Sequence, residues 1–218
     1  MAVTPQAKDP IVLSYLALRK AVGIVAVALP FILSIPWWLL RGHLLQSSIS
    51  GYYYTDMRNL FVGSLCAISM FMLCCRGYDR KDEIAGILGA ICALGVAFFP
   101  TTPDCGATPS QHEVGIVHYA FAATLFLILS YFCLVLFKMT AADRQVTRKK
   151  VQRNLVYTIC GSAILASMLA LVVFNLVLKV KYLAGNLGTT FCFETTSLIA
   201  FGIAWLVKGE TFLKDDTP

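Results

Sequence analysis

The stretch that decides the fold reads SGYYYTDMRNLFVG and covers residues 50–63. Its first half is polar and aromatic, and its second half runs directly into an apolar segment. Three consecutive tyrosines are typical of a membrane–water boundary, where the ring sits among lipid head groups and the hydroxyl stays hydrated. Asp56, Arg58 and Asn59 then stand at the start of the helix that is expected to follow. Two interpretations are open: an interfacial anchor that begins a helix, or one wall of a functional pocket.

The composition around this stretch is that of a membrane protein. The chain has 218 residues, of which 58% are hydrophobic and only 14% are charged, whereas a soluble domain has roughly 25% charged residues. Its mean hydropathy is +0.72. A membrane-spanning helix takes about 20 apolar residues, so the length allows about five to seven spans with short connections. We therefore expect residues 1–218 to form a single transmembrane domain.

The apolar segments predict an all-α fold, a polytopic bundle of six transmembrane helices. The predicted spans are residues 21–40, 59–75, 84–99, 114–137, 155–178 and 189–207. Residues 11–20 are expected to form a separate short helix along the inner interface.

Two local patterns add detail to these spans. Pro30 and Pro36 are expected to kink the first span. In the third span, small residues recur at helical spacing and predict a narrow face against which another helix packs closely. These residues are Gly86, Ala90, Ala93 and Ala97.

The basic residues predict the orientation, because lysine and arginine are enriched in cytoplasmic loops. With six spans, one side of the membrane holds Lys8, Arg19, Lys20, Arg76, Arg80, Lys81, Lys138, Arg144, Arg148, Lys149, Lys150, Arg153, Lys208 and Lys214. The other side holds Arg41, Arg58, Lys179 and Lys181. This bias of 14 to 4 predicts that both termini are cytoplasmic.

The net charge and the cysteines point to no other class of protein. A net charge of +6 could indicate nucleic-acid binding, but the basic residues flank apolar runs, where they orient helices and meet anionic lipid. We therefore exclude a nucleic-acid partner.

Six of the eight cysteines lie within apolar runs and are expected to be packing residues. Only Cys105 and Cys192 could face an oxidising compartment and pair there.

Polar residues within or beside the spans predict a site near the outer membrane face. Glu194 lies about five residues inside the last span, which is roughly 7 to 8 Å below its outer end. An acidic group at that depth is a functional-site hypothesis, the alternative being a structural hydrogen bond between helices. The candidate ligand-binding residues are Asp56, Asn59, His118, Asn175, Thr190, Glu194 and Ser197.

The positions of these residues suggest a ring. Thr190 and Ser197 share the helical face of Glu194, and Asp56 and Asn59 are expected to point inward because they share a face with Gly63. If the helices form a compact bundle, these groups and Thr101–Thr102 converge on a polar pocket that opens to the non-cytoplasmic side.

Metal and cofactor motifs are weak in this sequence. His112 and His118 are six residues apart and do not share a helical face, and no H-x-x-x-H motif is present. A zinc site of His118, Asp56 and Glu194 is geometrically open but is not our prediction, and a haem is less favoured still. A nucleophilic Ser50 or Ser197 would depend on how the helices pack. We predict no metal site, and the sequence names no cofactor.

The chain resembles a family of bacterial six-helix membrane proteins related to the DRAM and Sfk proteins. Ser50 and Asp56 carry the resemblance, together with the Phe98-Phe-Pro100 exit from the third span and the run Phe201-Gly-Ile-Ala-Trp205. The resemblance implies a compact bundle with a lipid-linked role in the inner membrane, and it supplies no catalytic residues. Ceramidase-type seven-helix hydrolases differ from this chain in span count and in their paired histidines.

The sequence therefore leads to one expectation with two alternatives. We expect a multi-pass bacterial inner-membrane protein, embedded in the lipid bilayer, whose outward-facing polar pocket binds or moves a small molecule or lipid. The first alternative is an intramembrane hydrolase that uses His118, Glu194 and Asp56. The second is a scaffold without a ligand, in which the polar ring only holds helices together.

Overall fold

The structure is a computed structural model, and it describes residues 10–42, 45–74, 80–140, 147–178 and 188–213. The described residues form six helices. They are α1 (Pro10–Arg41), α2 (Arg58–Cys74), α3 (Arg80–Phe98), α4 (Pro109–Leu134), α5 (Arg148–Val172) and α6 (Thr189–Lys208). Three short helical turns join or extend them, namely η1 (Ser50–Tyr54), η2 (Leu136–Lys138) and the π-helical η3 (Val173–Val177).

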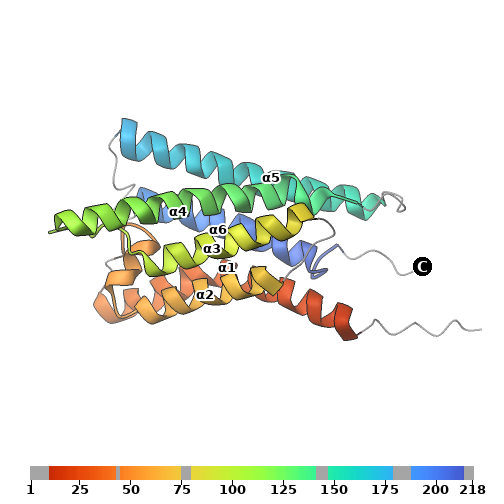
Figure 1. Cartoon of the computed structure of the whole chain (residues 1–218), viewed down its shortest axis with the longest axis horizontal. Helices are drawn as coiled ribbons and strands as arrows, with labels where there is room; N and C mark the ends of the chain where they lie inside the picture. The colour runs from red at the N-terminus through yellow and green to blue at the C-terminus, as the bar shows by residue number, and fades with distance from the viewer. Residues whose placement is uncertain (1–9, 43–44, 75–79, 141–146, 179–187, 214–218) are drawn as a thin grey trace, which may run out of the picture.

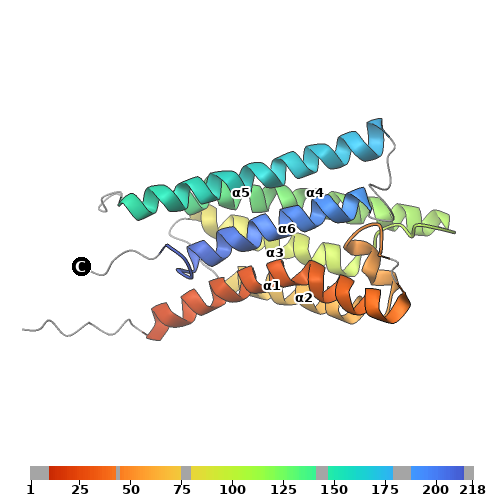
Figure 2. The same ribbon diagram turned by 180° about the vertical axis from the view of Figure 1, so that it is seen from behind.

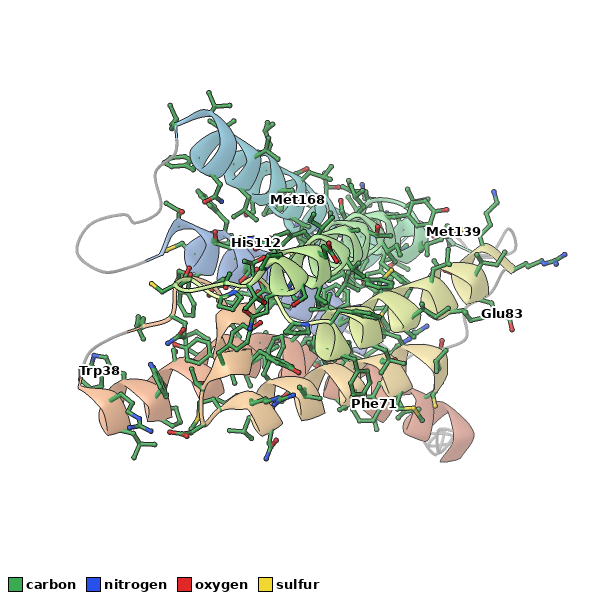
Figure 3. The ribbon with its side chains drawn as sticks, turned by 60° about the vertical axis from the view of Figure 1, so that its left-hand side comes forward. Trp38, Phe71, Glu83, His112, Met139 and Met168 are labelled. Carbon is green, nitrogen blue, oxygen red and sulfur yellow. The ribbon has the colours of Figure 1, made fainter. Side chains whose placement is uncertain are left out.

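The six helices lie side by side along the long axis of the molecule and form a closed ring (Figures 1 and 2). Each helix packs against the next one in the chain, and α6 returns to pack against α1. We call the end that holds residues 52–54 the tyrosine end, and the end where α1 begins and α6 ends the terminal end. Trp38 and His112 lie towards the tyrosine end, whereas Glu83 and Met139 lie towards the terminal end (Figure 3).

Two glycines allow α6 to close the ring against α1. A Cβ atom on Gly23 would lie 2.8 Å from the carbonyl oxygen of Gly202, and a Cβ on Gly202 would lie 2.7 Å from the carbonyl oxygen of Gly23. Both distances are too short for any side chain, so the two backbones touch at this crossing. Close approach through small residues is a common way for helices to pack in a bilayer, where apolar side chains gain little by leaving lipid.

The narrow face predicted on α3 is confirmed. Gly86, Ala90, Ala93 and Ala97 are all buried. This face packs against α2, where a Cβ on Gly86 would lie 3.2 Å from the carbonyl oxygen of Met72. The Ser69 hydroxyl of α2 also donates a hydrogen bond of 3.0 Å to the Ala90 carbonyl.

Within the described residues, four helices are long and apolar enough to cross a membrane. They are Tyr15–Arg41, Pro109–Lys138, Arg148–Asn175 and Thr189–Lys208. The helix Arg58–Cys74 is apolar but shorter, and α3 begins with four charged residues in succession. The all-helical fold of a membrane protein is therefore as predicted, whereas six spans and the orientation of the termini stay predictions.

Several predicted boundaries differ from the structure. The expected break after residue 20 is wrong, because α1 is one continuous helix of 32 residues that includes Pro30 and Pro36. The fourth helix begins five residues earlier than its predicted span, since Thr108 and Gln111 form a capping box and Pro109 occupies the first turn. The fifth begins seven residues earlier, where the Thr147 side chain accepts a hydrogen bond from the Lys150 amide.

Basic side chains bind carbonyl groups of η2, the turn that extends α4, at the terminal end. The Nζ atom of Lys150 donates to the carbonyl oxygens of Phe137 and Met139, at 3.0 and 3.2 Å. Lys208 from the last turn of α6 donates to the same Phe137 carbonyl at 3.3 Å. Cations are favourable here because the last carbonyl groups of a helix have no partner within it.

Candidate ligand-binding site

The connection between α1 and α2 docks onto the first turn of α6. The carbonyl oxygen of Ser47 accepts a hydrogen bond of 2.9 Å from the Phe191 amide. Gly188, which precedes α6, lies so close that a Cβ on it would be 2.2 Å from the Ser47 carbonyl oxygen. The turn is also closed locally, because the Gly51 amide donates to the Ser48 hydroxyl at 3.0 Å. Residues 47–51 therefore form a fixed wall at the tyrosine end.

Glu194 connects this wall to α6. Its Oε2 atom accepts a hydrogen bond of 2.6 Å from the backbone amide of Ile49, and the amide of Ser50 is a second donor to the same carboxyl group. These amides stand at the start of η1, where backbone donors have no helical partner of their own. A carboxyl group in an apolar bundle requires such donors. Glu194 thus has a structural role in addition to any role towards a ligand.

Tyr52 anchors the same segment from inside. Its ring is fully buried and packs against Trp37 and Phe191, with ring centroids 6.4 Å apart in each case. Burial raises the pKa of the Tyr52 hydroxyl to about 12. The first tyrosine of the interfacial triplet is therefore a core residue. Only Tyr54 is exposed, and its hydroxyl donates to the Thr101 carbonyl at 2.7 Å.

A cavity of about 640 Å³ lies beside this wall, between α4, α5 and α6. This volume is within the usual range of roughly 300 to 1,000 Å³ for ligand pockets. The cavity is lined by Ser47, Ser48, Ser50, Thr101, Thr102, Asp104, His118, Tyr119, Ala122, Ala123, Phe126, Met168, Leu171, Val172, Asn175, Thr190 and Glu194.

The lining of this cavity is divided into two parts. Most of the polar groups come from residues 47–50, residues 101–104 and the first turns of α6, at the tyrosine end, and His118, Tyr119 and Asn175 add polar groups from α4 and η3. The apolar groups lie further along α4 and α5 and include Phe126 and Met168. Met168 is labelled in Figure 3, on α5. A molecule in this cavity would therefore meet hydrogen-bonding groups at one end and apolar side chains at the other.

His118 stands where the two parts meet. It is buried, with 2% of its surface exposed, and its Nδ1 atom lies 2.7 Å from the Phe99 carbonyl oxygen. A carbonyl oxygen only accepts hydrogen bonds, so Nδ1 carries the proton and Nε2 is left as an acceptor in the neutral ring. A smaller cavity of about 40 Å³ continues from this point, and His118 and Glu194 line it together with apolar residues such as Leu125.

A side-chain hydrogen bond joins η3, which extends α5, to α6 beside the cavity. The Asn175 amide donates to the Thr190 hydroxyl at 3.2 Å and to the Leu171 carbonyl at 3.1 Å. Asn175 lies within the π-helical η3, where the ordinary helical hydrogen-bond pattern shifts. Such π-helical turns are frequent at functional sites. In both views α5 leans away from the bundle towards this end (Figures 1 and 2).

The structure brings together four of the seven candidate residues. His118, Asn175, Thr190 and Glu194 all line the cavity. Ser197 does not, because it is buried one turn further on and donates to the Phe193 carbonyl at 2.9 Å. Whether the four bind a ligand stays a prediction.

Asp56 and Asn59 do not point inward, so that prediction is wrong. Both are exposed, and Asp56 pairs with Arg41 at 2.5 Å on the surface. The inward face of this region is occupied by a stripe of apolar side chains, each about one helical turn from the next, and these side chains fill the core. The stripe is Met57, Phe61, Leu65, Ile68 and Met72.

Several cavity residues were not among the candidates. Ser47 and Ser48 lie in the connection before the tyrosines, and Asp104 lies in the loop after α3, where its Oδ2 accepts a hydrogen bond of 2.6 Å from the Ser47 hydroxyl. Tyr119, next to His118, has its hydroxyl 3.2 Å from the Thr101 hydroxyl. For Asp104, the sequence offered one signal: residues 104–113 contain no lysine or arginine, which is typical of a loop on the non-cytoplasmic side.

The residues that line the cavity can bind a ligand through hydrogen bonds from their hydroxyl, amide and carboxyl groups. Within the described part of the chain, no group of three or more His, Cys, Asp or Glu side chains could hold a metal ion. The hydrolase set of His118, Glu194 and Asp56 is not assembled, because Asp56 is on the surface with Arg41. Cys105 and Cys192 are both free thiols.

No family model, no curated protein and no solved structure matches the chain.

Proposed function

We propose that the protein is a six-span inner-membrane protein, with both termini cytoplasmic, that binds or moves a small molecule or lipid. The observation that carries this proposal is the cavity of about 640 Å³ with polar groups at one end and apolar walls at the other. A cavity of this size lined by convergent polar groups is the usual form of a small-molecule site.

The orientation follows from charge and from the two ends of the bundle. Arg19, Lys150, Arg153 and Lys208 all belong to the terminal end. The positive-inside rule places that end in the cytoplasm and the cavity at the opposite membrane face. Six basic residues of the original count lie outside the described residues, namely Lys8, Arg76, Arg144, Lys179, Lys181 and Lys214. The six-span count requires α2 and α3 to cross the bilayer with the four longer helices.

The second candidate function is the ligand-free scaffold. In a ligand-free scaffold, the bond of Glu194 to the Ile49 amide and the bond of Asn175 to Thr190 would serve only to join helices. Both bonds would be needed in either case, so they do not distinguish the two functions. The two functions differ in whether a molecule occupies the cavity.

The test compares two adjacent positions on α5. Met168 lines the cavity, whereas Leu169 is 65% exposed on the outer surface of the same helix. We expect mass spectrometry of the purified protein to detect a retained lipid or small molecule in the wild type and in Leu169→Trp. In Met168→Trp the added ring fills the cavity, so the retained molecule should be depleted. Equal retention in all three proteins, or none in any, would contradict the proposal in favour of the scaffold.

A further inference from the structure

Helices α4 and α5 are in close contact in the half of the bundle nearer the terminal end. The Ser130 hydroxyl of α4 donates a hydrogen bond of 3.2 Å to the Gly161 carbonyl of α5. A Cβ atom on Gly161 would lie 2.5 Å from Cγ of Leu134 and 3.1 Å from Cβ of Cys133. The glycine therefore brings the two helices together at this level.

Towards the tyrosine end, the cavity lies between the same two helices. Because antiparallel helices advance by equal rises, the hydrogen bond between them sets their register. Seven residues outward from that bond, Ala123 of α4 lies opposite Met168 of α5, and eleven residues outward, Tyr119 lies opposite Val172. All four residues line the cavity. In both views α5 leans away from the bundle towards this end (Figures 1 and 2).

The space between α4 and α5 is open at the molecular surface. Tyr119 is 52% exposed and Val172 is 50% exposed, and Ala123 is also exposed, although all three line the cavity. On the other side, η3 is tied to α6 by the hydrogen bond from Asn175 to the Thr190 hydroxyl. The cavity therefore opens sideways, and we call the gap at Tyr119, Ala123 and Val172 the side opening.

The side opening faces the hydrocarbon of the membrane. Both helices that form it belong to segments long and apolar enough to span a bilayer, and apolar side chains such as Leu127 and Leu169 are exposed on their outer surfaces. The α5 wall from Met168 to Asn175 is the last part of its apolar segment. It covers about 10 Å of helix, which is less than half of a hydrocarbon core of about 30 Å. Lipid chains of the leaflet at the tyrosine end therefore meet the opening directly.

An apolar gap open to hydrocarbon is filled by acyl chains, because an empty gap loses dispersion contacts. Resting on the proposed function, we infer that the ligand is a membrane lipid of the leaflet at the tyrosine end, and that its acyl chain enters the cavity through the side opening. The chain lies along the apolar walls of Phe126, Met168 and Leu171. The ester and head groups lie at the polar end, where the hydroxyls of Ser48 and Thr102 can donate and accept hydrogen bonds.

The test uses a phosphatidylcholine that carries a photoreactive diazirine at the end of one acyl chain. The full-length protein is placed in nanodiscs that contain this lipid and is irradiated, and mass spectrometry of its peptides then maps the labelled residues. We expect labels on the cavity walls, at Phe126, Met168 and Leu171. We also expect a label at Ile159, which is exposed on α5 and does not line the cavity.

Two double variants test the route of entry. Ala123→Trp with Val172→Trp narrows the side opening from both helices, at positions that are exposed and should tolerate a larger side chain. This variant should lose the labels on the cavity walls and keep the label at Ile159. The matched control is Ala120→Trp with Leu169→Trp, which adds the same side chain at exposed positions of the same helices outside the cavity lining. It should be labelled like the wild type.

The possible outcomes separate this inference from the proposed function. Labels only at outer-surface positions such as Ile159 in the wild type would overturn the inference. Cavity labels that survive in the narrowed variant, or that are lost equally in the control, would overturn it as well. Each of these results leaves the proposed function standing if Met168→Trp still depletes a retained molecule. Absence of both the cavity labels and any retained molecule would overturn both.

Discussion

The carboxylate Oε2 of Glu194 accepts the backbone amide of Ile49 at 2.6 Å, across 145 positions of the chain. This bond joins α6, the last helix, to the connection between the first two. It places the Ser47–Ser50 wall against the cavity and puts an acidic group at the cavity's polar end. The Glu194 carboxyl group therefore holds the connection in place and also lines the cavity. Substitutions can separate these two roles.

Replacing Glu194 tests its structural role. Glu194→Leu should lower the free energy of unfolding by about 1 to 3 kcal/mol, because the Ile49 amide would lose its acceptor. Glu194→Gln should be milder, since an amide oxygen still accepts the bond. Melting temperatures in one detergent would measure both effects, with Glu113→Leu as the control on an exposed carboxylate. If Glu194→Leu melts like the wild type, the bond does not hold the connection.

Gly188→Ala tests the close contact between the connection and α6. The φ angle of Gly188 is −63°, which alanine adopts freely, so any effect comes from packing. Its Cβ would lie 2.2 Å from the Ser47 carbonyl oxygen, and we expect a loss of roughly 1 to 3 kcal/mol. Gly63→Ala is the matched control, because no atom would lie within 4 Å of the new Cβ. Alanine is favoured over glycine inside a helix, so this variant should be more stable than the wild type by roughly 0.5 to 1 kcal/mol. Similar melting temperatures for both variants would contradict this packing.

Reporter fusions test the orientation. A fusion after Lys150 should report the cytoplasm, and a fusion after Gly106 should report the opposite side, because the two positions belong to opposite ends of the bundle. The reverse pattern would contradict both the orientation and the outward-facing cavity. Cytoplasmic signals at both positions would contradict the span assigned to α4.

Thiol labelling tests the two cysteines near the tyrosine end. Cys105 is exposed and free, and Cys192 is half-buried and free. We expect Cys105 to label readily without reductant and reductant to add no further labelling at either position. An increase at both positions after reduction would show that they pair.

The surface ion pair predicts a null result. Asp56 and Arg41 are both more than half exposed, and pairs of this kind contribute between about 0 and 1 kcal/mol. Asp56→Asn should therefore shift the melting temperature little and leave the retained molecule unchanged. Loss of the retained molecule in Asp56→Asn would contradict this prediction and show that Asp56 contributes to the binding site.

Helix type and membrane class follow from local sequence alone. Apolar runs of about 20 residues must satisfy their backbone groups within a helix, so composition predicts the fold class without knowledge of packing. The small residues of α3 show their face by spacing, because positions three and four apart share one side of a helix. Apolar segments do not show where a helix starts, since α4 and α5 begin before their apolar segments, at caps formed by Thr108 and Thr147.

The site depended on tertiary structure. Glu194 and His118 could be identified as candidates because polar groups in an apolar run are unfavourable without partners. Their partners could not be identified, since Ile49 and Phe99 contribute backbone atoms, which every residue has. Asp56 was misplaced for a related reason: the face of α2 that turns inward depends on which side chains fill the core, and Met57 and Phe61 fill it. Spacing shows which residues share a helical face, but only packing against the other helices decides which face is buried.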